Sequence, residues 1–174
     1  MASAAFDEFF MRMALREAEK AADDGEVPTG CIIVEEPADD NAPPSSVRIL
    51  GRAHNQTEML KDATAHAEML ALSAAFAARG NWRLANTRLY VTKEPCPMCA
   101  GAIILARIST VIWGVSDPKR GGGTTFNIFE HPGINHHPHV LRGILEEPCR
   151  AVLVDFFRRR RQEKEEGKHP SCND

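Results

Sequence analysis

TAHAE at residues 64–68 and EPCPMC at residues 94–99 decide how this chain is organised. Together the two segments supply three ligands of the soft kind that zinc prefers: His66, Cys96 and Cys99. Three protein ligands leave the fourth position of a zinc ion open for water, as in catalytic rather than structural sites. Glu68 lies two residues after the histidine. A carboxylate beside such a site is expected to act as an acid and base, not as a ligand.

Local helix geometry can bring these ligands together. Residues three apart on a helix share a face, so the two cysteines can point at one metal ion. The partial positive charge of a helix N-terminus favours the thiolate that zinc binds. We expect a helix at residues 63–78 with Thr64 as its N-cap, which puts His66 and Glu68 in the first turn. Because two residues turn a helix by about 200°, Glu68 is expected to reach the substrate beside the metal.

The hydrophobic pattern predicts alternating helices and strands. Helices are expected at residues 6–22, 63–78, 97–106 and 149–166, and strands at residues 30–34, 47–55, 87–91 and 109–114. The first two strands are expected to pair antiparallel across a loop at residues 36–46. Residues 115–138 are expected to form a loop with one helical turn near residues 126–130. The strand–helix–strand order implies right-handed crossovers, so we predict an α/β chain with a three-layer α/β/α fold and a mixed central sheet.

The composition is typical of one globular domain. The chain has 174 residues, 43% of them hydrophobic, which is enough for one core. We expect a single domain over residues 1–166 and a disordered tail at residues 167–174. No apolar run reaches the roughly 18 residues of a membrane span, and no secretory signal pattern opens the chain. We therefore expect no membrane association and a cytoplasmic location. Five cysteines, an odd count, argue against a disulfide framework.

Charge is distributed unevenly, although the net charge is only −3. Residues 1–46 hold 3 basic and 11 acidic side chains, whereas residues 103–161 hold 9 basic and 5 acidic ones and four histidines. A local basic surface can bind a polyanion even when the total charge is negative. An ordinary solvated surface explains the same pattern, so charge alone leaves both interpretations open.

The two cysteines have other interpretations when they are taken alone. A CxxC pair occurs as a redox couple or as half of a structural zinc site. A redox couple does not need the preceding His66 and Glu68, and a structural site needs a fourth protein ligand. Both halves of the pattern lie at expected helix starts, which favours a catalytic zinc site.

These residues carry a resemblance to a known family. The HxE and PCxxC motifs are those of zinc-dependent nucleobase deaminases, and the chain resembles the cytidine deaminase superfamily here. It is more closely similar to the bacterial tRNA-specific adenosine deaminases, over residues 6–162. The further matching positions are Glu26-Val27-Pro28, Asn55, Asp117, Lys119, His131-Pro132-Gly133, Asn135-His136 and Asp155-Phe156-Phe157-Arg158.

The resemblance implies an activity, a cofactor and partners. It implies hydrolytic deamination of adenosine to inosine at the wobble position of a tRNA anticodon loop, with one Zn²⁺ per subunit and no organic cofactor. It also implies a flipped base in a pocket that two subunits of a homodimer share. By the same resemblance, His66, Cys96 and Cys99 bind zinc and Glu68 transfers protons. The residues expected to bind the substrate are Val27, Asn55, Asp117, Lys119, His131, Asn135, Phe157 and Arg158.

Some residues depart from the family pattern or fit a simpler role. The loop at residues 36–46 is longer than usual, Lys93 stands where an apolar residue is usual, and GGGTT at residues 121–125 replaces a typical small-residue loop. Asn55 also fits a turn residue after a strand. The arginines at residues 158–161 also fit a solvated helix end.

The zinc motifs do not choose the substrate, so two other functions stay open. The same zinc core is used by enzymes that deaminate a free base, nucleoside or nucleotide, such as guanine, cytosine or dCMP. The alternative outside the enzymes is an RNA-binding protein with a structural zinc ion. The pocket and the C-terminal helix are the regions that distinguish these functions.

Overall fold

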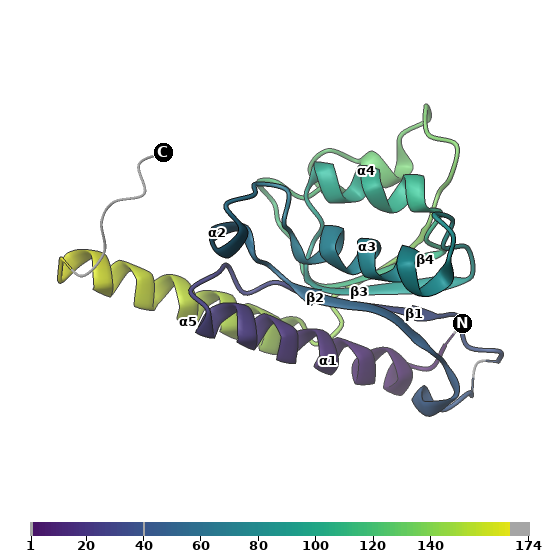
Figure 1. Ribbon diagram of the computed structural model, residues 1–174, viewed down its shortest axis with the longest axis horizontal. Coiled ribbons are helices and arrows are strands. Elements are labelled where there is room, and N and C mark those ends of the chain that lie inside the picture. Colours follow the sequence, from purple (N-terminus) through teal and green to yellow (C-terminus); the bar gives the residue numbers. More distant parts are fainter. Residues whose placement is uncertain (1, 40, 168–174) are drawn as a thin grey trace.

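The computed structural model describes residues 2–39 and 41–167 of the chain (Figure 1). Apart from residue 167, the tail expected at residues 167–174 lies outside the described residues. The elements in chain order are α1 (Ala4–Asp23), β1 (Gly30–Glu35), η1 (Pro44–Ser46), β2 (Ile49–His54), α2 (Thr57–Leu60), α3 (Ala67–Arg79), β3 (Thr87–Lys93), α4 (Pro97–Ala106), β4 (Thr110–Val115), η2 (Ile128–Glu130), β5 (His139–Arg142) and α5 (Glu146–Glu165).

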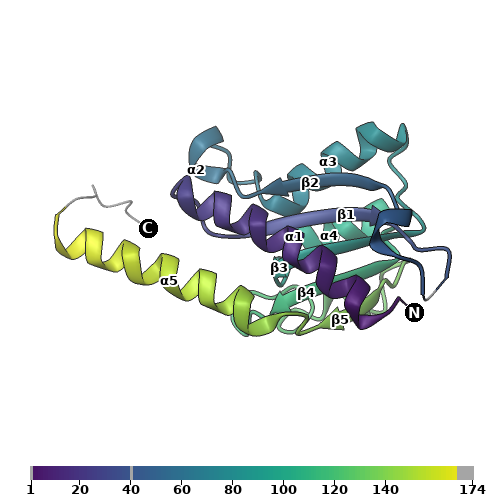
Figure 2. The same cartoon turned by 90° about the horizontal axis from the view of Figure 1, so that it is seen from below.

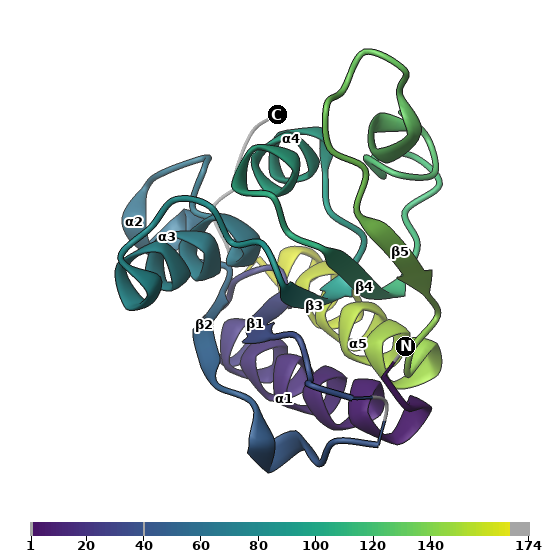
Figure 3. The same cartoon turned by 90° about the vertical axis from the view of Figure 1, so that its right-hand side faces the viewer.

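The strands form one mixed sheet in the order β2-β1-β3-β4-β5. β1 pairs antiparallel with both β2 and β3, whereas β3, β4 and β5 are parallel neighbours. Figure 3, which looks along the sheet, shows β2 and β5 at its two edges. The parallel strands β3 and β4 both lead into the region where α3 and α4 begin, so the carboxyl ends of the strands face the expected metal ligands.

Helices cover both faces of the sheet, which confirms the predicted three-layer α/β/α fold. α3 and α4 pack on one face against Leu89 and Val91 of β3. α1 and α5 pack on the other face (Figure 2), where the ring of Phe10 contacts that of Tyr90. The three inner strands β1, β3 and β4 are buried on both faces, which is why β1 and β4 read as nearly continuous apolar runs. Among the helices of the described residues, none has the length and apolar composition needed to cross a membrane.

Small residues bring α3 very close to the sheet. Ala67, Ala71 and Ala75 form a fully buried face of this helix. They lie over Gly51 of β2, where an added Cβ would meet the carbonyl oxygen of Ala71 at 2.2 Å. The alanines of this segment therefore serve close packing as well as helix propensity. Their packing fixes the position of the α3 N-terminus, which carries the metal motif.

A buried ionic network ties the long loop after β1 to the core. Arg88 of β3 is only 2% exposed and donates to Asp7 of α1 at 2.8 Å and to Glu36 at 2.7 Å. Tyr90 donates to the same Asp7 carboxylate at 2.7 Å. Every charge in the network has an opposite partner, as buried ions require. The first residue of the loop at 36–46 is therefore anchored, although the loop itself is largely exposed.

A second carboxylate, Glu17 of α1, joins the helix to β2. It is almost fully buried and accepts hydrogen bonds from Lys20 and Arg52 and contacts His54. Burial alone would raise the pKa of Glu17, but the hydrogen bonds from these basic neighbours lower it further than burial raises it. The ionised carboxylate is thus the form that the fold stabilises.

Several elements differ from the sequence prediction. α3 begins at Ala67 with His66 as its N-cap, so the prediction of Thr64 as the N-cap was wrong. The short helix α2 and the edge strand β5 were not predicted. Both are short and follow polar or proline-rich sequence, so their structure depends on tertiary packing rather than on local pattern. The helical turn expected near residues 126–130 is present as η2.

Candidate active site

Three metal-ligand atoms converge where α3 and α4 begin. His66 is the N-cap of α3, Cys96 is the N-cap of α4, and Cys99 lies in the first turn of α4. The Nδ1 atom of His66 is 3.6 Å from the Sγ of Cys96 and 3.5 Å from the Sγ of Cys99. The two sulfur atoms are 3.7 Å apart. Within the described residues, this is the one cluster of potential metal ligands with all donor atoms within 4.8 Å.

These spacings match the edges of a zinc coordination tetrahedron. With Zn–S bonds of about 2.3 Å and Zn–N bonds of about 2.0–2.1 Å, two sulfur ligands lie about 3.8 Å apart, and a sulfur and a nitrogen about 3.6 Å apart. The measured separations of 3.7, 3.6 and 3.5 Å agree with these values. The donor set therefore fits a zinc ion that would be held by three protein atoms, leaving one ligand position for a group that is not part of the protein.

Of the three ligands, Cys96 is the one whose pKa is shifted toward the form that binds a cation. The hydrogen bond between the sulfurs of Cys96 and Cys99 lowers the pKa of Cys96 to about 3 and raises the pKa of Cys99. The hydrogen bond to Cys96 likewise raises the pKa of His66. One thiolate is thus already favoured, and thiolates are the form in which cysteines bind zinc.

Glu68 lies beside the ligands without being one of them. His66 has an extended backbone (φ −74°, ψ 152°), whereas Glu68 belongs to the first turn of α3. The two side chains reach the same pocket because the histidine lies outside the helix, so the 200° rotation expected within a helix does not separate them. Glu68 is 3% exposed, and burial raises the pKa of its carboxyl. A carboxyl that ionises less readily than usual is suited to exchanging protons.

Asn55 caps α3 in place of the histidine. The side chain of His66 faces the two cysteines and makes no capping hydrogen bond. The Oδ1 atom of Asn55, at the end of β2, accepts instead from the backbone N–H of Ala67 at 2.9 Å. This contact satisfies a donor at the helix N-terminus that the histidine leaves free. The capping amide therefore lies on the wall of the same pocket.

The pocket over the metal cluster has the size of a single ring system. Its volume is about 190 Å³, smaller than the cavities that hold drug-sized ligands. Its lining residues are Val27, Thr29, Asn55, Thr57, His66, Glu68, Lys93, Glu94 and Cys96. The expected substrate residues Val27 and Asn55 thus lie beside the expected catalytic carboxylate.

The sequence prediction did not include four of these lining residues: Thr29, Thr57, Lys93 and Glu94. No pattern marks the two threonines, because one precedes a strand and the other lies on the unpredicted helix α2. Glu94 directly precedes the PCxxC motif, and Lys93 is a departure from the family pattern, so the pattern assigns it no role.

Glu94 holds the loop after β4 against the pocket. Its carboxylate accepts from the backbone N–H groups of Asp117, Gly123 and Thr124 at 2.7, 3.0 and 2.6 Å. An added Cβ at Gly121 would meet this carboxylate at 2.4 Å, so the loop needs glycine there. The GGG sequence therefore allows a close approach. The loop positions Asp117, which pairs with Lys93 of the pocket wall.

Other predicted substrate residues lie outside the pocket. Phe157 of α5 is 45% exposed and lines a second pocket of about 140 Å³, which shares Val27 and Thr57 with the first. Lys119 is exposed in the loop after β4. Arg158 is exposed and pairs with Asp155 of the same helix at 2.8 Å.

Two predicted residues, His131 and Asn135, lie in an exposed loop that this chain does not bring to its own pocket. The side chain and carbonyl of Asn135 accept from Arg107 at 2.8 and 3.0 Å. Arg107 is the C-cap of α4, at the opposite end of that helix from Cys96. The chain alone therefore does not join them to the metal cluster.

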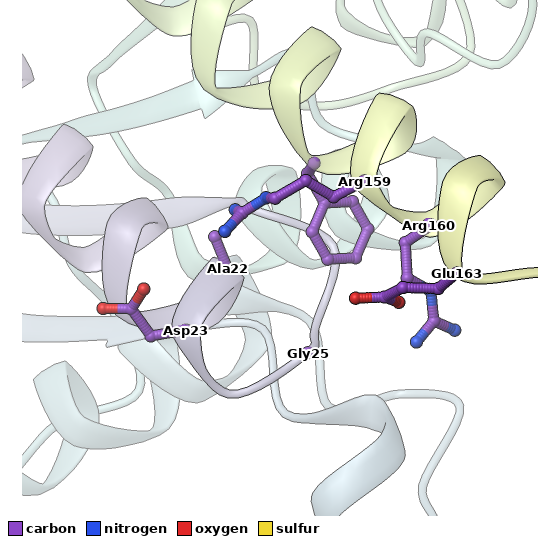
Figure 4. A pocket seen from close by; sticks show the side chains of 7 residues that line it. Ala22, Asp23, Gly25, Arg159, Arg160 and Glu163 are labelled. Carbon is purple, nitrogen blue, oxygen red and sulfur yellow. The ribbon is translucent and has the colours of Figure 1, made fainter. Parts of the chain in front are cut away.

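A third pocket continues the second one along α5. It has a volume of about 250 Å³ and shares Gly25, Phe156 and Arg160 with its neighbour. Figure 4 shows Arg159, Arg160 and Glu163 of α5 opposite the end of α1. Each pocket shares lining residues with the next, so the three lie in a row from the metal cluster to the basic end of α5, and this row is called the track below.

Comparison with known proteins now identifies the family. Residues 4–115 match the family described as Cytidine and deoxycytidylate deaminase zinc-binding region. The chain belongs to this deaminase family. The resemblance expected from the two motifs is confirmed, and so is zinc as the cofactor, since the described family and the three-atom cluster agree.

Within the deaminase family, the chain is similar to tRNA-specific adenosine deaminases along its length. The protein of that name from Bacillus subtilis (strain 168) is 44% identical over 159 residues, which cover 91% of this chain and 92% of the relative. The protein of that name from Streptococcus pyogenes serotype M1 is 44% identical over 162 residues, with 92% and 89% coverage.

Solved structures agree with this placement. A structure from a study of A-to-I editing by tRNA:A34 deaminases at the wobble position of transfer RNA superimposes with a TM-score of 0.75. It is 39% identical and covers 83% of this deaminase and 99% of that chain. A guanine deaminase from Nitrosomonas europaea is 20% identical and superimposes with a TM-score of 0.69. The matched region covers 90% of this chain and 85% of the guanine deaminase chain. The second likeness shows the shared fold alone.

Proposed function

We propose that this deaminase hydrolyses adenosine to inosine at the wobble position of a tRNA anticodon loop, in the cytoplasm and as a homodimer. The observation that carries the proposal is the ring-sized pocket in which Glu68 and Asn55 face the metal cluster. Identity of 44% to tRNA-specific adenosine deaminases supports the choice of substrate. The reaction breaks the C6–N bond of adenine, forms a C6–O bond, consumes water and releases ammonia.

The chain's own residues supply the metal site and the proton transfers. His66, Cys96 and Cys99 would hold the zinc ion. When bound, zinc acts as a Lewis acid that lowers the pKa of a coordinated water toward about 7. The Glu68 carboxylate takes a proton from water, delivers it to N1 of the purine ring, and passes another to the departing amino group. Burial, which raises the pKa of Glu68, lets this group both accept and return protons.

Asn55 gives the pocket a donor of fixed direction. Its Oδ1 is occupied by the N–H of Ala67, so its Nδ2 group is the part of the amide that remains for the substrate. Nδ2 is a donor only and therefore favours an acceptor on the substrate, such as a purine ring nitrogen or a ribose oxygen. The cap on α3 thus sets the orientation of a substrate contact.

The track along α5 favours a polynucleotide over a free base. The second pocket adjoins the base pocket, and the third pocket, lined by Arg159 and Arg160, adjoins the second (Figure 4 shows the third). Phe157 exposes an aromatic ring on this route, and exposed rings stack on unpaired bases. A free base would fill the first pocket and leave the rest of the track unused. Nucleotides next to the target can occupy it, as an anticodon loop with splayed bases requires.

A homodimer would give a role to residues that the single chain leaves apart. His131 and Asn135 lie in an exposed loop on the far side of α4 from the ligands. Leu105, near the same end of α4, is 72% exposed, an unusual environment for a leucine. We propose that this side of α4 contacts a second subunit and that the loop contributes to the partner's substrate site.

The test compares substrates under one condition. The zinc-loaded protein is incubated with tRNA that carries adenosine at the first anticodon position, with the same tRNA carrying guanosine there, and with free adenosine, guanine and cytidine. At low enzyme concentration, we expect inosine and ammonia from the first tRNA and from none of the other substrates. Ammonia from free guanine or cytidine together with an unchanged tRNA would refute the proposal.

A further inference from the structure

One charged side chain of the base pocket has no role in the account so far. Lys93, the last residue of β3, lines the pocket and is 31% exposed on its side chain. It is the one lysine or arginine among the nine residues that line this pocket. Two carboxylates, Glu68 and Glu94, share the same wall. The pocket wall therefore carries one basic side chain beside two carboxylates, and that side chain is partly exposed.

Asp117 fixes the lysine in this place. The Nζ of Lys93 donates to Oδ2 of Asp117, while Oδ1 accepts from the backbone N–H groups of Lys119 and Arg120, both at 3.0 Å. Both oxygens of the aspartate are thus engaged within the chain. The loop that carries Asp117 is in turn held by Glu94. The ion pair is therefore supported by a built loop, not by a single flexible contact.

The ammonium group keeps donors for the substrate. An ammonium has three N–H donors, and within residues 2–39 and 41–167 Asp117 is the ion-pair partner of Lys93. A carboxylate-rich pocket repels the phosphates that a polynucleotide substrate must bring to its mouth. A cation in that position attracts them, because charge-assisted hydrogen bonds to phosphate are strong.

We propose that Lys93 binds a phosphate group next to the reacting nucleotide and makes the pocket select a nucleotide within RNA over a free base. The inference rests on the proposed function, since it names a contact made by that substrate. Lys93 is here a specificity-determining residue, and Asp117 is its ion-pair partner within the described chain. The chemistry recognised is the anionic phosphodiester, which a free base lacks.

The experiment removes the charge from each side of the contact. Lys93→Met keeps the length of the side chain and removes its charge. An anticodon stem-loop with a neutral methylphosphonate at the linkage 5′ or 3′ of the target adenosine removes the charge of the phosphate. We expect Lys93→Met to raise KM about 10- to 100-fold with the ordinary stem-loop, to change kcat little, and to flatten the salt dependence of KM by about 0.7 in log–log slope.

The two changes are then combined. With one of the two modified linkages, the KM of wild type should rise as much as the Lys93→Met substitution raises KM with the ordinary stem-loop. The KM of Lys93→Met should not rise further with that linkage, because the same contact is already absent. If the substitution and the modified linkage raised KM additively at both linkages, the inference would be overturned. An unchanged KM and salt slope in Lys93→Met, with wild type active on the stem-loop, would also overturn it.

Two further variants separate binding from loop support. Asp117→Asn keeps an oxygen for the two backbone N–H groups and frees the ammonium, so KM should fall or stay level. If Lys93 only held the loop, Asp117→Asn would raise KM as Lys93→Met does. Arg12→Met removes an ion pair with Glu8 on the outer side of α1 and should match wild type. A wild type that leaves the stem-loop unreacted would refute the proposed function, which is a distinguishable result.

Discussion

Asn55 caps α3 and also lines the pocket, so two substitutions at this position should affect the stability and the activity of the protein to different extents. Asn55→Ala removes both the Oδ1 that accepts from the N–H of Ala67 and the Nδ2 that faces the pocket. Asn55→Asp keeps an oxygen for the cap but replaces the Nδ2 donor with an acceptor. The first variant should therefore lose stability and activity, and the second should lose activity while keeping more of the stability.

The magnitude follows from the burial of this contact. Ala67 is fully buried and Asn55 is 7% exposed, so the alanine variant leaves a buried N–H without a partner. Such a group costs about 1–3 kcal/mol. In a chain of this size each kcal/mol lowers Tm by about 2–4 °C, so Asn55→Ala should melt about 2–12 °C lower. A carboxylate at a helix N-terminus is favourable, so Asn55→Asp should melt above the alanine variant.

Thermal unfolding followed by circular dichroism, and kcat/KM with an anticodon stem-loop, measure the two effects. Loss of the donor should lower kcat/KM by about 10- to 100-fold in both variants. Equal Tm values for wild type and Asn55→Ala would refute the capping argument. Wild-type activity in Asn55→Asp would refute the argument that the pocket needs the donor.

Three further predictions concern the metal cluster and the buried ions. Cys99→Ala should lose zinc, seen as less than one equivalent of metal by mass spectrometry after gel filtration, because two ligands bind more weakly than three; a full equivalent would contradict the assignment. Arg88→Met should cost about 3–5 kcal/mol in urea unfolding, because it leaves Asp7 as an uncompensated buried charge; a loss below about 1 kcal/mol would show that the network relaxes. The lowered pKa of Glu17 means that its stabilising contribution is present above its ordinary pKa of 4.5 and is lost as pH falls through the lower folded value. Glu17→Gln should therefore destabilise the protein at pH 7 and weaken the fall in Tm from pH 5 to pH 3; an unchanged pH profile would count against this linkage.

That the three candidate ligands would lie together could be predicted from the sequence, because much of their arrangement depends on local structure. Cys96 is the N-cap of α4 and Cys99 its third residue, a spacing at which the two side chains meet at the first turn, and Pro97 marks the start of that helix. The order of strands and helices then places α3 and α4 side by side. The four predicted strands and the mixed sheet follow from the same local patterns, and all four are present.

The parts that the sequence did not predict depend on contacts between distant segments. Nothing near His66 indicates that Asn55, eleven residues earlier, would cap its helix. β5 pairs with β4 only after a long loop returns to the sheet edge. The pairing of Lys93 with Asp117 joins the end of β3 to the loop after β4, and residue spacing gives no sign of it. Residues that act through such contacts can be identified only from the folded structure.

The most direct test of the account maps inosine in tRNA with wild type and Glu68→Gln at equal zinc content. Sequencing of the reacted tRNA should show inosine at the first anticodon position and at no other adenosine with the wild-type protein. Glu68→Gln should keep its zinc and lower the rate by about 10²–10⁴-fold, because glutamine cannot carry the proton. Wild-type rates of inosine formation in Glu68→Gln, or inosine spread over many adenosines, would contradict the account.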